Sequence, residues 1–524
     1  MTVFQNNIRT FIISVALLSG FLSACSTIDE QGGASLNFKG QLSIFMVGPE
    51  ETVPDISFTL AALHIMSENG TSEPITTGTR VINSISVAGS QMNLAESPLP
   101  AGKYTELALI INSASMKKDD KIIPLITPDE RITVPVNVIV KRQQNTSLFI
   151  YWNADGSVAD GNKFSALMVE RKRKQELSSA LIYVTNEHSD NVSVINRYTG
   201  EVVETVSVGR KPRGIAASFS ATRPRLFVAN SGSDNISVID PATNRVEQEV
   251  PVRFGIEPVD VTVADISSDR KLLFVANYRS NNVSIVDAAT YGELEKIDVG
   301  SGPVSLAADP PADTLAVSRY LSSHDINELR SYREKFLNVY VVNQNSNNVS
   351  ILRIDIMTGR CVDVMNLAVD WDPRSLYVDY IRGRVYVANY GSDKLSVINI
   401  LKILSDGGTG AVTSINNVGN RITAVISDPV FNRLYLLRDL PGEIVILRPS
   451  SDENDAVRTM MSPVMGRIGV GNAPRALMLD SEKRKIYVVN RNSDDIYIID
   501  KTTRKTGQII RVGKKPYDIA VLSE

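Results

Sequence analysis

The residues best suited to chemistry lie in and just after a recurring Gly-x-x-Pro element. This element reads Gly209–Pro212, Gly255–Pro258, Gly300–Pro303, Gly471–Pro474 and Gly513–Pro516, while Asp370–Pro373 keeps only the proline and Gly419–Ile422 only the glycine. The candidate ligand-binding residues around it are Arg210, Lys211, Arg213, Asp260, Arg374, Arg475, Lys514, Lys515, Tyr517 and Asp518. Arginine offers planar donors that fit carboxylate or phosphate groups. Convergent carboxylates are instead suited to acid–base chemistry.

Other catalytic and metal-binding signals are missing from the sequence. The only histidines are His64, His188 and His324, and their spacing places no pair to bind a metal. No C-x-x-C-H motif, Gly-rich phosphate loop or G-x-S-x-G elbow occurs. The recurring N-x-x-S-D-N turn lacks the carboxylate density of a calcium loop. We therefore expect no cofactor, no metal site and no catalytic residue outside the candidates above.

Two alternating motifs organise the chain from about residue 181 onward. Besides Gly-x-x-Pro, a strand–turn–strand string recurs, as in IYVTNEHSDNVSVIN (182–196), LFVANSGSDNISVID (226–240) and VYVANYGSDKLSVIN (385–399). The residues that close its first strand are Asn186, Asn230, Asn277, Asn343, Asn389, Arg438 and Asn490, with steps of 44, 47, 66, 46, 49 and 52. Units of about 40–50 residues with four strands each are typical of propeller blades.

These strings support a family resemblance and a fold. YVTN and YVAN, followed by the polar turn and V-G-x-x-P, resemble the YVTN family of β-propeller repeats over about 180–524. The prediction is an all-β chain with a seven-bladed propeller at 181–524. The first unit lacks a Gly-x-x-Pro strand and the last has one in excess, so YDIAVLSE (517–524) should complete the first blade.

The fourth unit is irregular. LAVSR (315–319) and VYVVN (339–343) both fit the second strand of this blade, and the sequence leaves the choice open. Only 24 residues separate Arg319 from Asn343, which is too few for another blade. We interpret LSSHDINELRSYREKFLN (321–338) as an insertion with helical character.

Antiparallel strand order predicts which face carries the candidate site. Chain direction reverses at every strand, so the Gly-x-x-Pro crossings and the N-x-x-S-D-N turns should emerge on one face. A basic arc over three neighbouring blades is then expected from Arg210, Lys211, Arg213, Arg475, Lys514 and Lys515. One hypothesis is an anionic ligand or acidic protein loop bound over the channel mouth. The alternative is a solvated rim balanced by Asp260 and Asp518.

The region before the repeats has a different pattern. Alternating apolar runs such as QLSIFMV (41–47) and ITVPVNVIVK (132–141) predict an antiparallel β-sandwich at 38–170. Together with the turn LPAG (99–102) they resemble an uncharacterised sandwich domain of bacterial lipoproteins, which implies a fold and no chemistry. Residues 26–37 are expected to be a tether. Residues 171–180, which begin with a basic run, are expected to be a linker.

The N-terminus predicts export and lipidation. Arg9 precedes an apolar run at 10–22, which is typical of a signal peptide at 1–25. The run ends in LSAC, which resembles a lipobox with Cys25 as the lipidated residue, and Ser26 favours sorting to the outer membrane. No second apolar run approaches bilayer length, so membrane attachment is expected through lipid alone. The net charge of −3 argues against nucleic acid as a partner.

Two classes of function follow from these observations. The first is a lipid-anchored cell-envelope scaffold that binds a protein or polysaccharide ligand on the motif-bearing face. The alternative is a channel-centred lyase or hydrolase, which resembles propeller lactonases and lyases. Asp260, Asp518 and Tyr517 are the only reacting groups available to such an enzyme.

Overall fold

The computed structural model describes residues 39–48, 53–75, 78–88, 91–127, 130–142, 144–171, 181–219, 223–253, 255–267, 270–405, 407–449, 464–480 and 482–522. The expected signal peptide, Cys25, the tether and most of the linker lie outside these residues. The regular secondary structure of the described chain is nearly all β. None of its helices combines the length and the apolar content that crossing a bilayer requires.

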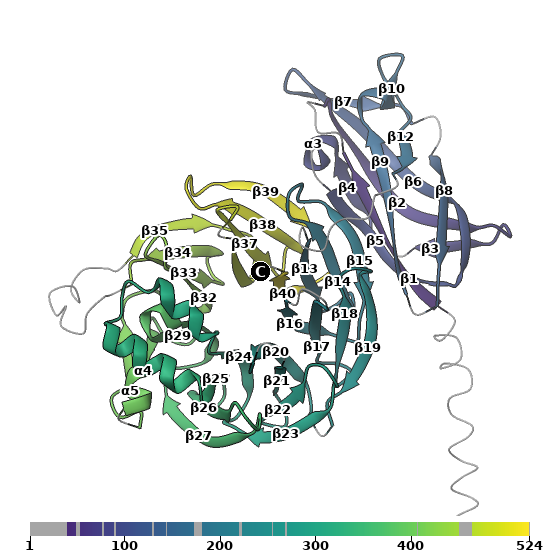
Figure 1. Cartoon of the computed structure of the whole chain (residues 1–524). Helices are drawn as coiled ribbons and strands as arrows, with labels where there is room; N and C mark the ends of the chain where they lie inside the picture. The colour runs from purple at the N-terminus through teal and green to yellow at the C-terminus, as the bar shows by residue number, and fades with distance from the viewer. Residues whose placement is uncertain are drawn as a thin grey trace, which may run out of the picture.

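The described part of the chain after residue 180 folds into seven four-stranded antiparallel sheets, arranged in a ring (Figure 1). In order from the centre outward, sheet 1 holds β40 (Pro516–Val521), β13 (Leu181–Asn186), β14 (Asn191–Asn196) and β15 (Val202–Ser207), and sheet 2 holds β16 (Pro212–Ser218), β17 (Arg225–Asn230), β18 (Asn235–Asp240) and β19 (Arg245–Pro251). Sheet 3 holds β20 (Pro258–Asp265), β21 (Lys271–Asn277), β22 (Asn282–Asp287) and β23 (Glu293–Asp298). Sheet 4 holds β24 (Pro303–Ala308), β25 (Phe336–Asn343), β26 (Asn348–Asp355) and β27 (Cys361–Ala368). Sheet 5 holds β28 (Pro373–Asp379), β29 (Arg384–Asn389), β30 (Leu395–Asn399) and β31 (Val412–Ile415). Sheet 6 holds β32 (Ile422–Asp428), β33 (Arg433–Arg438), β34 (Glu443–Leu447) and β35 (Val464–Gly469). Sheet 7 holds β36 (Pro474–Asp480), β37 (Lys485–Asn490), β38 (Asp495–Asp500) and β39 (Thr506–Arg511).

In five of the seven sheets, the two sequence motifs form one packed unit. In sheet 2 the buried Asn230 closes β17, and its Nδ2 donates to Asn235 Oδ1 at 2.9 Å and Ser237 Oγ at 2.8 Å. A Cβ added to Gly209 would lie 2.7 Å from the Asn230 amide, so only glycine fits there. The same glycine–asparagine contact recurs in Gly255 with Asn277, Gly300 with Asn343, Gly471 with Asn490 and Gly513 with Asn186. The alternation of the motifs therefore has a packing cause.

In five of the seven sheets, the polar turn is bonded to the crossing that leaves the sheet. Asp234 adopts a left-handed backbone with φ 52°, which Asp and Asn tolerate, and its Oδ1 accepts the Glu257 N–H at 2.8 Å. Equivalent bonds join Asp190 to Lys211, Asn281 to Gly302, Asn347 to Asp372 and Asp494 to Lys515. The predicted turn role of these side chains and the shared face of both motifs are confirmed. We call this side of the ring the motif face.

The C-terminal strand completes sheet 1, as predicted. β40 pairs with β13 in the register Ile182 to Val521 and Val184 to Ile519. In sheet 4 the open choice is resolved, because β25 carries VYVVN and pairs with β24. LAVSR instead begins within the 3₁₀-helix η3 (Ala312–Val317), and the insertion contains α4 (Ser323–Arg333), which confirms its helical character.

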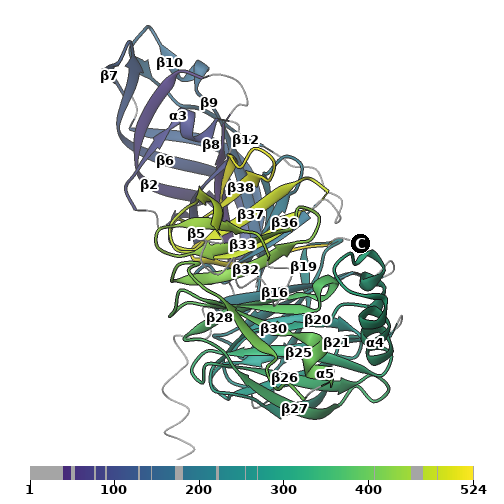
Figure 2. The same ribbon diagram turned by 90° about the vertical axis from the view of Figure 1, so that its left-hand side faces the viewer.

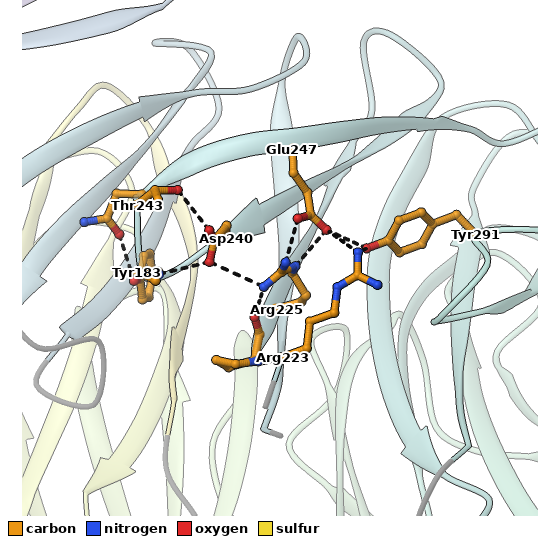
Figure 3. Close-up of polar contacts among 10 residues, drawn as sticks. Tyr183, Arg223, Arg225, Asp240, Thr243, Glu247 and Tyr291 are labelled. Atoms are coloured by element: carbon orange, nitrogen blue, oxygen red, sulfur yellow. Dashed lines mark hydrogen bonds and ion pairs between the residues drawn. The ribbon is translucent and has the colours of Figure 1, made fainter. Parts of the chain in front are cut away.

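The face opposite the motif face carries ion pairs both within sheets and between them. Asp379 accepts the Arg382 N–H at the 3₁₀-helix η4 (Tyr380–Arg382), and the Arg382 guanidinium bonds Asp379 and Ser427 of the next sheet. Asp428 similarly caps its turn and pairs with Lys501 of sheet 7. Near the rim of sheets 2 and 3, Arg225 binds Glu247 through two bonds of 2.7 Å (Figure 3). Capping of the turn after the innermost strand is therefore only part of the role of Asp379 and Asp428.

The N-terminal sheets pack beside sheets 7 and 1 (Figures 1 and 2). One has the order β12-β9-β1-β5, from β12 (Leu167–Glu170), β9 (Asn145–Asn153), β1 (Lys39–Val47) and β5 (Gln91–Pro100); the other joins β3 (Ser72–Ile75), β2 (Asp55–Ser67), β6 (Gly102–Lys118), β7 (Lys121–Leu125), β4 (Arg80–Asn83) and β8 (Arg131–Val140). Both sheets contribute to one core, in which the Phe58 ring lies 5.0 Å from Trp152 and 5.7 Å from Phe164.

One pairing in the N-terminal sheets corrects the prediction of a purely antiparallel arrangement. β1 and β9 run parallel, with Ile44 opposite Leu148. Period-two patterning reports which face of a strand is buried and not the direction of its neighbour, so the sequence could not predict this. β5, which pairs with β1 on the other side, was also missed because its apolar residues do not alternate regularly.

The N-terminal sheets and the ring share a buried interface. Phe45 and Phe149 stack at 5.2 Å and belong to the same apolar cluster as Ile182 and Val202 of sheet 1. The buried Gln91 side chain forms two hydrogen bonds with the Val202 backbone, of 2.7 and 3.1 Å. The two parts are therefore packed together, which the polar linker in the sequence did not indicate.

Candidate functional site

A cavity of about 460 Å³ opens at the centre of the motif face, and we call it the mouth cavity. Two variable positions of each repeat supply most of its lining. The residue after the proline contributes Arg213, Val259, Val304, Arg374, Arg475 and Tyr517, with Thr423 in the repeat that lacks the proline. The residue after the strand-closing asparagine or Arg438 contributes Tyr278, Gln344, Tyr390, Asp439 and Arg491. The cavity is thus lined by arginines, aromatic rings and carboxylates from different sheets.

Arg213 is at the centre of an ion-pair network at the mouth. Its Nε lies 3.0 Å from Glu187 Oε1, and its Nη1 lies 3.1 Å from Glu257 Oε1. Glu187 also pairs with Arg491, and only 4% of its side chain is exposed. Burial alone would raise the pKa of Glu187, but the hydrogen bond from Arg491 and the charge of Arg213 outweigh it and lower the pKa. Glu187 therefore holds two guanidinium groups in place.

Tyr517 lies against two arginines. The Arg475 Nη2 donates to the Tyr517 hydroxyl at 3.0 Å, and its guanidinium lies 4.6 Å from the centre of the ring. The Arg213 guanidinium lies 5.6 Å from the same ring. Cation–π contacts of this kind stabilise the arginines in fixed positions. Arg374, farther around the mouth, bonds Asp372 through Nε at 2.8 Å and Nη2 at 2.9 Å.

Asp260 and Asp518 line a deeper cavity of about 180 Å³ in the channel, together with Arg475 and Tyr517. Each carboxylate accepts backbone N–H groups from its own strand and from the next sheet. Asp260 Oδ2 accepts Leu306 N at 2.9 Å, and Asp518 Oδ2 accepts Ile215 N at 3.1 Å. Burial, and next the charge of Asp518, raise the pKa of Asp260 to about 7, and burial also raises the pKa of Asp518. The two groups are therefore electrostatically linked and also tie neighbouring sheets together.

The predicted basic arc does not form one surface. Arg213, Arg374, Arg475 and Tyr517 meet in the mouth cavity, and Asp260 and Asp518 lie below it. Lys211 lines a neighbouring cavity with Arg279, whereas Lys514 lines a cavity against the N-terminal sheets. Lys515 donates to Asn492, and the backbone N–H of the exposed Arg210 donates to Ser233. Successive residues of a tight crossing point in different directions, so residues that are neighbours in the sequence do not lie on one surface.

The acids that balance the mouth were missed at the sequence level. The expected partners were Asp260 and Asp518, whereas Glu187, Glu257 and Asp372 make the ion pairs with Arg213 and Arg374. A signal was present, because Glu187 occupies the variable position after the strand-closing asparagine and Glu257 the position before the proline. The first of these positions lines the mouth cavity in five of the seven repeats, and the second lines it in two.

The arrangement suits binding by hydrogen bonds and ring contacts. Among the residues that the structure describes, no three His, Cys, Asp or Glu side chains gather closely enough to hold a metal ion. The arginines keep unused N–H donors, and the carboxylates and tyrosines supply acceptors. Donors and acceptors that are already held in place lose little freedom when a ligand binds.

Radial four-stranded antiparallel sheets around a channel define a protein of the β-propeller type. The chain is similar to a functionally unknown protein from Desulfotomaculum acetoxidans, with 12% identity, TM-score 0.50 and coverage of 66% of this chain and 99% of that chain. Hydrazine synthase from Kuenenia stuttgartiensis is also similar, with 17% identity, TM-score 0.48 and coverage of 62% and 93%. At 12% identity, the likeness to the Desulfotomaculum acetoxidans protein shows the fold alone. No family model matches the sequence, and comparison with curated proteins found no match.

Asp260 should give the protein a pH-dependent stability of definite sign. Its pKa is about 7 in the folded protein against an ordinary 3.8, so between these values the folded state holds more protons than the unfolded state. Stability from this group therefore falls as pH rises from about 4 to about 7 and then levels off. We expect Asp260→Asn to remove this dependence, an effect of up to about 4 kcal/mol at 1.36 kcal/mol per pH unit.

Urea unfolding at a series of pH values measures this effect. The stability of Asp260→Asn relative to the parent should rise from about pH 4 to about pH 7, and the two curves should run parallel above about pH 8. Parallel curves over the whole range would contradict the raised pKa of Asp260.

Proposed function

We propose that this chain is an exported bacterial lipoprotein of the outer membrane, anchored by acyl chains on Cys25. Residues 181–524 form a seven-bladed β-propeller of the YVTN type, and residues 38–170 form a β-sandwich domain. Residues 26–37 and 171–180 act as tether and linker. The lipobox-like LSAC string supports the anchor, and the seven four-stranded sheets, five of which keep both interlocked motifs, support the propeller.

The function is that of a binding scaffold for a protein or polysaccharide ligand at the motif face. One observation carries this proposal: the mouth cavity of about 460 Å³ brings together arginines and tyrosines from several sheets, with the guanidinium groups held by carboxylates and rings. Concave sites with a few oriented polar groups are typical of ligand binding. The net charge of −3 and the balanced mouth disfavour nucleic acid.

A channel-centred lyase or hydrolase is the second candidate. Its support is the pair Asp260 and Asp518, whose raised pKa values are of the kind used in acid–base catalysis. Binding remains the better supported function, because both carboxylates bond backbone N–H groups of two neighbouring strands and so have a structural role.

Capture from native membranes tests the binding function. The full lipidated chain is used as bait, with Cys25→Ala as the anchoring control and the double variant Arg213→Gln/Arg475→Gln as the site control. We expect one specific protein or glycan to be recovered, with recovery reduced about tenfold or more in the double variant, since charge-assisted hydrogen bonds are worth about 1.5–3 kcal/mol each.

A matched control for that experiment is Arg330→Gln on α4, which is exposed and outside the mouth cavity. It should recover the same ligand in full. Recovery that is unchanged in the double variant, or no specific recovery by the lipidated parent, would contradict binding at the mouth.

A further inference from the structure

Trp371 departs from its counterparts on the motif face. It occupies the second position of the crossing into sheet 5 and is 71% exposed. The same position in the other crossings holds Arg210, Ile256, Ser301, Asn420, Asn472 and Lys514, none of them aromatic. An indole has a large apolar surface that is usually buried against a partner. Its exposure beside the mouth cavity therefore needs a reason.

The backbone that carries Trp371 is firmly held. Its N–H donates to Asp370 Oδ1 at 2.9 Å, and its carbonyl accepts the Gly391 N–H at 3.0 Å. A Cβ on Gly391 would lie 3.1 Å from that carbonyl oxygen, so glycine permits this close approach of crossing and turn. The indole is thus presented from an ordered position.

The residues next to Trp371 lead into the mouth cavity. Tyr390 precedes Gly391 and lines the cavity, and its hydroxyl donates to Asp439 at 2.8 Å. The Arg374 guanidinium, paired with Asp372, lies 4.6 Å from the centre of the Tyr390 ring. Aromatic surface, a cation and two carboxylates therefore follow one another from the crossing into the mouth.

The charge balance of this region selects among ligands. Arg213 is paired with Glu187 and Glu257, and Arg374 is paired with Asp372. Arg475 and Arg491 also line the cavity, so four arginines there lie beside four carboxylates, those of Glu187, Glu257, Asp372 and Asp439. An acidic polymer requires cations in excess, which this balance does not leave. Sugar hydroxyls donate and accept at once, so paired arginines and carboxylates match them, and the C–H face of a sugar ring packs on an aromatic face.

We propose that the mouth cavity and Trp371 bind a neutral, hydroxyl-rich glycan chain. One sugar ring packs on the Trp371 indole, and the next is hydrogen-bonded by Arg374 and Asp372. This inference rests on the proposed binding function and names its ligand class. An acidic peptide or an acidic glycan is the competing ligand.

Tryptophan fluorescence of the full chain in detergent provides the test, because the sequence contains two tryptophans and Trp152 is 0% exposed. Iodide should therefore quench Trp371 selectively. The probes are neutral oligosaccharides built of glucose and of N-acetylglucosamine, an oligogalacturonate and an oligoglutamate peptide. We expect a neutral oligosaccharide to protect Trp371 from iodide, and neither acidic probe to do so.

Calorimetric titration of variants follows with the neutral oligosaccharide that protects Trp371. Trp371→Ala should weaken binding about tenfold, which corresponds to about 1.4 kcal/mol, because the variant loses the ring on which the sugar packs. Trp371→Phe should restore most of the affinity. Met357→Ala is the matched control, because Met357 is an 88% exposed apolar residue in the β26–β27 turn on the opposite face.

The outcomes separate this inference from the proposed function. Binding of an acidic probe alone, lost in Arg213→Gln/Arg475→Gln, would overturn the neutral glycan and leave the binding function standing. Neutral binding that survives Trp371→Ala unchanged would overturn the role of Trp371. Binding of no probe would overturn the inference, and the capture experiment would then decide the function by itself.

Discussion

Truncation after Val512 is expected to abolish folding of the ring. This deletion removes β40, the innermost strand of sheet 1, and leaves the long edge of β13 unpaired. It also removes Ile519, Ala520 and Leu522, which are buried in two apolar clusters on either side of sheet 1. Two large buried side chains and a lost strand pairing amount to at least about 5 kcal/mol, which is comparable to the whole stability of a typical domain.

The matched control removes only Ser523 and Glu524, which lie beyond β40. This shorter deletion should leave the solubility and the cooperative unfolding of the parent unchanged. The longer deletion should yield aggregated or protease-sensitive protein, because an exposed edge strand pairs with other chains. A soluble, protease-resistant truncation product with an unchanged thermal transition would show that β40 does not close the ring.

Replacement of Arg197 by alanine is expected to destabilise the ring by about 3–5 kcal/mol, because it leaves a buried carboxylate without its partner. Arg197 lies in the turn after β14 of sheet 1 and binds Asp480 of sheet 7 through Nε at 2.6 Å and Nη2 at 2.7 Å. The two side chains are only 7% and 2% exposed. This pair joins the first and last sheets on the face opposite the motif face, so it supports the same closure as β40.

Denaturant unfolding, followed by circular dichroism, measures the effect of Arg197→Ala. The control is Lys103→Ala, which breaks an exposed ion pair with Glu68 and should cost at most about 1 kcal/mol. The double variant Arg197→Met/Asp480→Leu should recover much of the loss, since it leaves no unpaired buried charge. Equal destabilisation by Arg197→Ala and Lys103→Ala would contradict a role for Arg197 in closing the ring.

Much of the fold was predictable because its cause is local and repeated. The glycine of one motif packs on the asparagine of the other in the same sheet, as Gly209 does on Asn230, so both recur at matching intervals. The closing strand was predictable from the unequal ends of the repeat. The helical insertion before β25 was predictable, but the choice between LAVSR and VYVVN was not, because both strings have the apolar pattern of a strand.

The candidate site was predictable only in part. The positions after the prolines place Arg213, Arg374, Arg475 and Tyr517 at the mouth, as the repeat indicated. Their partners were not evident, because an ion pair such as Arg491 with Glu187 joins residues 304 positions apart. Trp371 was also not predicted as a site residue, since the exposure of a side chain is a property of the folded surface.

The sequence by itself determined the repeat, the alternation of its two motifs, the face on which they meet and the strand that closes the ring. These features depend on contacts within one repeat or between the two ends of the repeat region. Such contacts require particular residues at regular intervals, so they can be recognised in the sequence. Only the tertiary structure decided which variable residues share the mouth cavity, which acids neutralise its arginines and how the N-terminal sheets pack on the ring. Those relations join different sheets and depend on the direction and burial of individual side chains, which the local sequence does not indicate.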